Sequence, residues 1–185
     1  MADGSLDIIN IARRYYAGFY LYVSQKELLH TFSPSSIGLQ ELMLTRIIYA
    51  SQSTRLMNRE DVDQILESAR RHNVVDSVTG MLCYGNEKFL QCLEGENEQV
   101  DKIYNRILAD NRHKEILLID KQSLDRRTFG DWSMGFIDMN DSWTKIIVRQ
   151  IVHEEEFVPE RLDQATAFQL IKNLKYAMSD QLNIG

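Results

Sequence analysis

The chain has 185 residues, of which 44% are hydrophobic and 26% are charged, and its net charge is −6. This length and composition are those of one soluble globular domain with additional segments. The negative charge argues against non-specific binding to nucleic acid, and no apolar run approaches the roughly 20 residues of a membrane-spanning helix. We therefore expect a cytoplasmic protein without direct contact with nucleic acid or membrane.

Cysteine and histidine spacing gives no sign of a metal site. Cys83 and Cys92 form no CxxC pair, and the four histidines form no HxxxH or HExxH pair. Both cysteines fall in apolar segments, so we expect them to pack as small buried residues in adjacent strands.

Residues 1–42 precede the first clear strand and differ from the rest of the chain. Isoleucine, tyrosine and phenylalanine recur there at helical spacing, and the segment ends in Ser33-Pro34-Ser35-Ser36, a turn or linker signal. The pattern predicts an extension that is helical at first and then a linker. Met43 is a candidate alternative start.

The first strand and helix follow. Residues 44–51 are rich in isoleucine and predict a strand. Asn58 is a suitable N-cap for a helix that we expect to end near His72. One face of this helix carries Val62, Ile65, Leu66 and Ala69.

A hairpin and a second helix come next. Residues 78–84 and 88–94 predict two strands around Gly85-Asn86, a two-residue signal with glycine first, as a type II′ turn prefers. A helix then follows Asn97. Its apolar face carries Val100, Ile103, Tyr104, Ile107 and Leu108.

Two further strands complete the sheet, one over residues 115–120 and one around residues 132–137. The resulting order β-α-β-β-α-β-β is typical of an α+β, ferredoxin-like fold with one extra strand. We therefore expect a five-stranded sheet with two helices on one face.

Beyond Asp138 the pattern becomes helical. One stripe consists of Trp143, Ile146, Ile147, Gln150 and Ile151, and another, after Pro159, of Leu162, Ala165, Ile171, Leu174, Ala177 and Met178. The first core has no room for these helices, so we expect them to cover the sheet's other face or a partner. The chain thus divides into an extension (1–42), a domain (43–138) and a C-terminal helical pair (139–185) for output or oligomerisation.

Three short phrases each place one hydrogen-bonding or redox-capable side chain among apolar ones. They are centred on Tyr49, Gln91 and Trp132. If these side chains are buried, their polar atoms need partners, and a ligand with a polar edge would supply them. The pattern therefore predicts a cofactor site, although each residue alone has a simpler interpretation: a core tyrosine, an exposed strand glutamine and a packing tryptophan. Asn73 alone would be a helix C-cap.

Six motifs in this order resemble the BLUF family, the blue-light sensors that use FAD. They are IYAS, the helix end Ala69-Arg70-Arg71-His72-Asn73, TGML, FLQCLEG, DNRH and DWSMGF, between Leu44 and Phe136. Val78 and Ala69 depart mildly from the family pattern. The resemblance implies FAD as cofactor, with FMN or riboflavin as substitutes, and a short stand-alone photoreceptor that is not an enzyme.

The resemblance also implies roles for individual positions. Tyr49 would give an electron and a proton to the excited flavin, and Gln91 would lie between the phenol and the flavin N5/O4 edge and rearrange its amide. Asn73 would bond the C4=O/N3 edge, with His72 beside it. The secondary switch group would be Ser51, Trp132 and Met134. The ribityl-phosphate end would be lined by Arg106, Asp110, Arg112 and His113.

The output would pass through the C-terminal helices, a homo-oligomer or a separate signalling protein that the sequence does not identify. The alternative is a ferredoxin-like interaction module that has lost light sensing. Joint retention of Tyr49, Asn73, Gln91 and Arg112 argues against it. A flavoenzyme has no support, because the chain carries no GxGxxG fingerprint.

Overall fold

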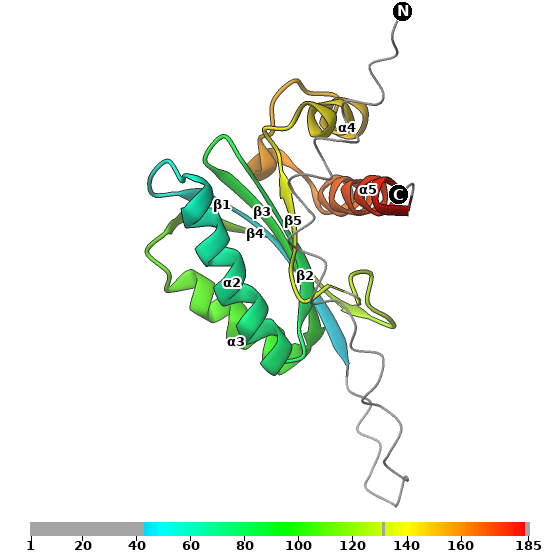
Figure 1. Cartoon of the computed structure of the whole chain (residues 1–185). Coiled ribbons are helices and arrows are strands. Elements are labelled where there is room, and N and C mark those ends of the chain that lie inside the picture. The colour runs from blue at the N-terminus through cyan, green and yellow to red at the C-terminus, as the bar shows by residue number, and fades with distance from the viewer. Residues whose placement is uncertain (1–42, 131, 184–185) are drawn as a thin grey trace, which may run out of the picture. The chain divides into compact units, whose positions relative to one another are not determined.

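The computed structural model describes residues 43–130 and 132–183 (Figure 1). Residues Glu41–Lys175 form one compact unit, which contains a single five-stranded sheet of order β4-β1-β3-β2-β5. Its strands are β1 (Leu44–Ser53), β2 (Thr79–Gly85), β3 (Lys88–Glu96), β4 (His113–Leu124) and β5 (Gly135–Asp138). Neighbouring strands are antiparallel except β2 and β5, which are parallel. The extension predicted for residues 1–42 lies outside the described residues.

Helices α2 (Arg59–Val75) and α3 (Asn97–Leu108) cover one face of the sheet (Figure 1). A capping box starts α2: the Asn58 side chain accepts from the Asp61 N–H, and the Asp61 carboxylate accepts from the Asn58 N–H. The sides of α2 and α3 toward the sheet bury Val62, Ile65, Leu66, Val100 and Ile103. The element order β-α-β-β-α-β-β confirms the predicted ferredoxin-like fold.

The β2–β3 hairpin differs from the prediction. Its turn residues are Asn86 and Glu87, with φ of 51° and 60°, and positive φ at both positions defines a type I′ turn. The predicted type II′ turn is wrong because Gly85 still belongs to the ladder, paired with Lys88. Gly85 has a packing role instead: a Cβ there would lie 2.7 Å from Cβ of Met139.

Three other boundaries shift. Helix α2 continues past His72 to Val75, and its C-cap is Asp76, whose N–H donates to the His72 carbonyl across 2.9 Å. Asn73 therefore lies inside the helix and is not its cap. Strand β4 extends beyond the predicted 115–120 at both ends, and the last strand begins at Gly135, so that Trp132 lies in the loop before it.

Strand β4 is an outer strand of the sheet, and its pairing with β1 is irregular. The register shifts twice, opposite Ile48/Tyr49 and Ala50/Gln52, and Glu115 has φ of 51°. Such bulges bend a strand and interrupt its hydrogen-bond ladder. Leu117 and Leu118 remain 44% and 45% exposed.

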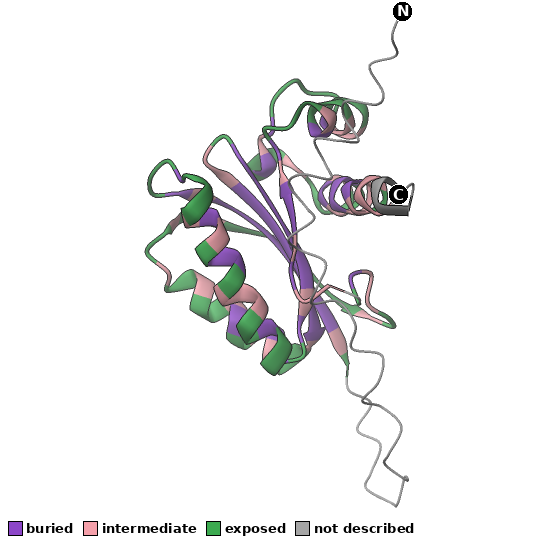
Figure 2. Cartoon of the chain, viewed as in Figure 1, coloured by how far each residue is buried: buried purple, intermediate pink, exposed green. Residues whose placement is uncertain are grey.

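Helices α4 (Ser142–Val152) and α5 (Gln164–Asn183) follow β5, with the short 3₁₀-helix η2 (Pro159–Arg161) between them. Up to Lys175, α5 lies on the opposite face of the sheet from α2 and α3, with its buried residues toward the strands (Figures 1 and 2). These are Ala167, Leu170, Ile171 and Leu174. This part of α5 thus occupies one of the two places expected for it.

The stripe predicted for α4 is not the side of this helix that is buried. Thr144 and Val148 are the buried residues of this helix, whereas Ile146 is 57% exposed and Gln150 is exposed. Thr144 tolerates burial because its hydroxyl donates to the Asp141 carbonyl across 2.7 Å. Among the described helices, none has the length and apolar character to cross a membrane.

Candidate functional site

Tyr49 and Gln91 are direct cross-strand partners in β1 and β3. They are 0% and 6% exposed, and the Tyr49 hydroxyl donates a hydrogen bond to Gln91 Oε1. The Tyr49 ring packs on Tyr104 of α3, with ring centroids 5.5 Å apart. The Tyr49–Gln91 pair therefore lies on the face of the sheet that the helices cover.

Burial determines the protonation of Tyr49. Desolvation, with smaller contributions from Tyr104 and Asp110, raises the pKa of the phenol far above its ordinary value. The phenol therefore remains a proton donor at physiological pH. Loss of an electron from the ring would require the hydroxyl proton to leave, and the acceptor in place is Gln91 Oε1.

The nitrogen of the same amide has a weaker partner. Gln91 Nε2 donates to Met134 Sδ across 3.5 Å, and a thioether is a poor acceptor. The backbone beside this contact is held from α2: Asn73 Nδ2 donates to the Ser133 carbonyl across 2.7 Å, and Arg70 Nε donates to the Met134 carbonyl across 3.0 Å. Gln91 thus contacts Met134, and Asn73 contacts the backbone of the residue before it.

Trp132 lies on the other face of the sheet, beside α5. A Cβ at Gly135 would lie 2.3 Å from Cε3 of the Trp132 ring, and Gly135 pairs with Met81, whose side of the sheet is opposite to that of Tyr49. Lys175 Nζ of α5 is 5.7 Å from the ring centroid. Of the three residues predicted to form the secondary switch group, Met134 contacts Gln91, Ser51 contacts His113, and Trp132 lies on the opposite face.

Ser51 and three of the predicted phosphate-end residues, Asp110, Arg112 and His113, gather near the start of β4. The Ser51 hydroxyl lies 2.8 Å from His113 Nδ1, and the His113 ring packs against Phe89 at 4.6 Å between centroids. Burial lowers the pKa of His113. Arg112 Nε donates to both carboxylate oxygens of Asp110, at 2.9 and 3.0 Å, and the Arg112 guanidinium lowers the pKa of that carboxyl.

Two predicted residues make their contacts elsewhere. His72 is exposed, and its Nδ1 lies 2.8 Å from the Ser68 carbonyl one helical turn earlier. Arg106 Nη1 donates to Asp76 Oδ2 across 3.1 Å, next to the bond from Lys102 Nζ at 2.6 Å.

Sequence reasoning missed Arg70, whose pKa is lowered to about 10 by burial. Its signal was an arginine three positions before Asn73, a spacing that places both side chains on one face of a helix.

The side chains around Tyr49 fit the edge of a flat heteroaromatic ring. The phenol and the amides of Gln91 and Asn73 offer donors and acceptors in a buried setting. The Gln91 nitrogen, held only by a thioether contact in this region, would gain from a carbonyl or ring-nitrogen acceptor. Arginines at the ends of α3 and β4 offer positive charge for a phosphate. This donor set suits a flavin.

These features define a small α+β domain with a flavin-type site under two helices. The chain matches the family described as BLUF, "Sensors of blue-light using FAD", over residues 44–135. It is 31% identical to a structure of BlsA in its photo-activated state, with 71% of this chain and 94% of that chain covered and a TM-score of 0.65. For the dark-state structure of BlrB, a BLUF protein, these values are 28%, 73%, 96% and 0.59. The chain belongs to the BLUF family, whose cofactor is FAD.

Longer proteins contain related segments. The chain is 35% identical over 102 residues to photoactivated adenylate cyclase subunit beta of Euglena gracilis, covering 55% of this chain and 12% of that protein. It is 34% identical over 97 residues to the blue light- and temperature-regulated antirepressor BluF of Escherichia coli (strain K12), covering 52% and 24%. The chain thus matches only 12% and 24% of the length of these two relatives.

Proposed function

We propose that this chain senses blue light with FAD bound between the sheet and helices α2 and α3, and that it signals to a partner protein. The observation that carries the proposal is the buried hydrogen bond from Tyr49 to Gln91, with the Gln91 nitrogen on Met134. When bound, FAD supplies blue-light absorption and a strong electron acceptor. Tyr49 and Gln91 supply a proton donor and a reversible amide.

Gln91 acts as the switch because its amide has two unlike ends. In the present orientation Oε1 accepts from Tyr49 and Nε2 donates to Met134. Reversal of the amide would present Nε2 to Tyr49 and Oε1 to Met134 Sδ. A thioether has no proton to donate, so the Met134 contact exists in one orientation only. Met134 therefore reports the state of Gln91 to β5, which starts at the next residue.

Asn73 would bond the C4=O/N3 edge of the ring, with His72 beside it in the same helix, and the Ser51 hydroxyl would orient the His113 ring. Arg106, Asp110, Arg112 and His113 would hold the ribityl-phosphate end, which requires Arg106 and Arg112 to exchange carboxylate partners for phosphate. The state of the site would leave the domain through the C-terminal helices, through a homo-oligomer or through a signalling protein that docks on them.

The test is the absorption spectrum of the purified full chain with FAD, before and after blue light. We expect a flavin band that shifts slightly to the red and returns in the dark. Bound FAD without a shift would contradict the Tyr49–Gln91 switch. A chain that binds no flavin would contradict the whole proposal and favour the ferredoxin-like interaction module.

A further inference from the structure

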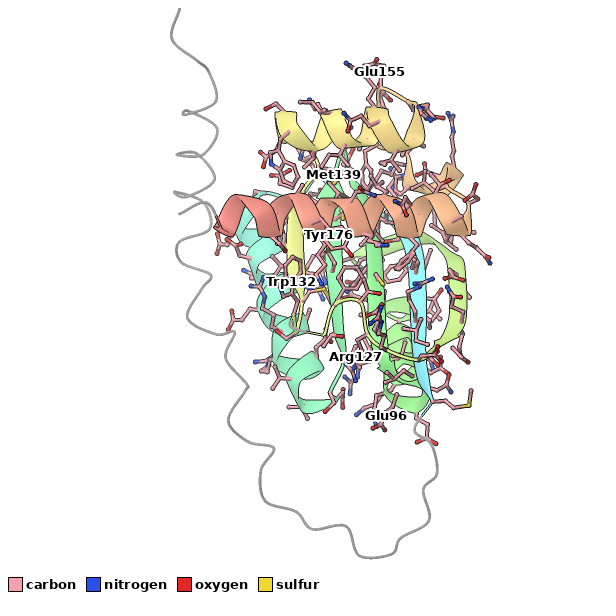
Figure 3. The ribbon with its side chains drawn as sticks, turned by 90° about the vertical axis from the view of Figure 1, so that its right-hand side faces the viewer. Glu96, Arg127, Trp132, Met139, Glu155 and Tyr176 are labelled. Atoms are coloured by element: carbon pink, nitrogen blue, oxygen red, sulfur yellow. The ribbon has the colours of Figure 1, made fainter. Side chains whose placement is uncertain are left out.

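The loop between β4 and β5 contacts both the candidate site and α5. Its described residues, 125–130 and 132–134, lead from Leu124 to Gly135. At its end, Met134 touches the Gln91 amide on the α2/α3 face. Earlier in the loop, Trp132 and Arg127 lie on the face that α5 covers (Figure 3). One loop therefore connects the two faces of the sheet.

Glu94 ties this loop to β3. It lies three positions after Gln91 and is 0% exposed. Its Oε2 accepts from the Thr128 and Phe129 N–H groups, at 2.6 and 2.9 Å, while Oε1 has no hydrogen-bond partner among the described residues. Arg127 Nη1 adds a bond to the Glu94 carbonyl across 3.0 Å. A buried carboxylate with two backbone donors is a strong, charge-assisted anchor.

Lys175 ties the same loop to α5. Its ammonium donates to the Thr128 carbonyl across 2.5 Å, and it lies 5.6 and 5.7 Å from the centroids of the Phe129 and Trp132 rings. The Trp132 N–H donates to the Phe129 carbonyl across 3.0 Å, which closes the loop on itself. The peptide at Thr128 is thus held on its N–H side by the sheet and on its carbonyl side by α5.

We propose that Glu94 and Lys175 are positioning residues for the Gln91–Met134 contact, and that α5 controls through them the lifetime of the light-adapted state. This inference rests on the proposed photoreceptor function. Together the two residues clamp the loop in the arrangement that presents Met134 to Gln91 Nε2. The clamp favours the amide orientation seen here over the reversed one, in which Met134 has no bond to accept.

The coupling must work in both directions, because a free energy that links two sites is reciprocal. If reversal of the Gln91 amide removes the Met134 contact and lets the loop move, it also weakens the hydrogen bond from Lys175 to the Thr128 carbonyl. The loop then restrains α5 less. Conversely, a change that releases Lys175 weakens the preference for the present orientation. Return from the light-adapted state should then be slower.

The experiment compares dark recovery of the FAD-loaded full chain in Lys175→Met, Glu94→Gln and wild type. Methionine keeps much of the lysine stem and removes the donor, and glutamine keeps an acceptor without charge. We expect each variant to keep the red shift and to recover more slowly by about fivefold or more, the lower end of typical coupling between sites. The control is Lys145→Met, which removes an exposed lysine of α4 and should recover at the wild-type rate. Lys175→Arg keeps a donor and should restore fast recovery.

The proposal is overturned if dark recovery in both Lys175→Met and Glu94→Gln is slowed by less than about fivefold, or is faster than in the wild type. A second readout separates it from the proposed function: the NMR signal of the Met134 methyl group in the dark, assigned with Met134→Leu. We expect this signal to move in Lys175→Met and Glu94→Gln but not in Lys145→Met. An unmoved signal overturns the clamp whether or not the wild type responds to light, whereas a wild type without a light response overturns the photoreceptor function alone.

Discussion

The two faces of the sheet bury polar side chains in different ways. On the α5 face, Arg46 Nη2 and Asp120 Oδ2 form an ion pair at 3.0 Å, with side chains only 6% and 5% exposed, and the Arg46 guanidinium stacks on Phe168 at 3.6 Å. Around Tyr49 on the α2/α3 face, the buried side chains of Gln91 and Asn73 are neutral, and the Gln91 nitrogen donates only to a thioether among the described residues. Strong, specific charge pairing fixes one arrangement, whereas weak neutral contacts leave two arrangements close in energy. The α5 face is built to hold elements in register and the other face to switch.

The largest effect is expected when the proton donor on the α2/α3 face is removed. Tyr49→Phe keeps the ring packed against Tyr104 and deletes the hydroxyl that bonds Gln91. We expect FAD to stay bound and the light-induced shift to disappear entirely in difference spectra. A normal shift in Tyr49→Phe would refute the role of this pair, and Tyr104→Phe serves as a control with the neighbouring phenol removed.

On the α5 face, substitutions should change the free energy of unfolding and leave the light-induced spectral shift unchanged. Arg46→Met leaves the buried Asp120 carboxylate bonded to Gln122 Nε2 without its cation, which should lower the free energy of unfolding by about 3–5 kcal/mol. The double variant Arg46→Met/Asp120→Leu removes both charges and should recover most of that loss. Urea unfolding in the dark measures both. If the wild type and the single variant have the same free energy of unfolding, the Arg46–Asp120 pair does not stabilise the fold.

A smaller effect is expected where α5 meets this pair. Phe168→Leu removes the aromatic face under the Arg46 guanidinium and should cost about 0.5–2 kcal/mol in the same urea assay. Phe168→Tyr keeps the aromatic face and should cost much less. If leucine and tyrosine destabilise the protein equally, the stacking contributes nothing beyond packing.

The smallest effect concerns pH and the His113 ring. Burial lowers its pKa in the folded protein, so the unfolded chain binds a proton more readily. Its contribution to stability is complete above the unfolded pKa of about 6.5 and is lost as pH falls below that value and through the lower folded pKa. The slope for one proton is at most about 1.4 kcal/mol per pH unit. In His113→Gln, the urea unfolding midpoint should change less between pH 7 and 5.5 than in the wild type. An equal change in both proteins would show that His113 is not the group responsible.

The sequence predicts well which side chains lie on the α2/α3 face, because strand alternation determines the face on which each strand residue lies. Tyr49 and Gln91 lie inside long strands, where the period of two places side chains on a known face. Trp132 cannot be placed in this way, since β5 begins only at Gly135 and alternation does not extend into a loop. The predicted turn type was wrong for a related reason: Gly85 pairs with Lys88 at the end of the ladder, so the turn residues are Asn86 and Glu87, and the sequence alone does not reveal that register.

The sequence indicates part of what is buried on the α5 face. Arg46, Glu94 and Asp120 are charged residues inside apolar strand segments, which already suggests that each must be paired. Their partners could not be assigned from the sequence, because the contact of Arg46 with Asp120 depends on β4 lying beside β1. The bond from Lys175 to Thr128 likewise joins residues 47 positions apart and follows from tertiary packing alone.

The irregular pairing of β4 bears on how the protein can accumulate in a cell. A long outer strand with two half-exposed leucines would offer a template on which further chains could add as strands, the first step toward fibres. The two register shifts interrupt the row of free backbone groups on this strand, and the exposed side chains of Lys114 and Lys121 place charge along it. Both features disfavour the addition of another strand. Deleting a bulged residue would straighten the strand, and the resulting protein would fold with a better-paired sheet and a greater tendency to aggregate.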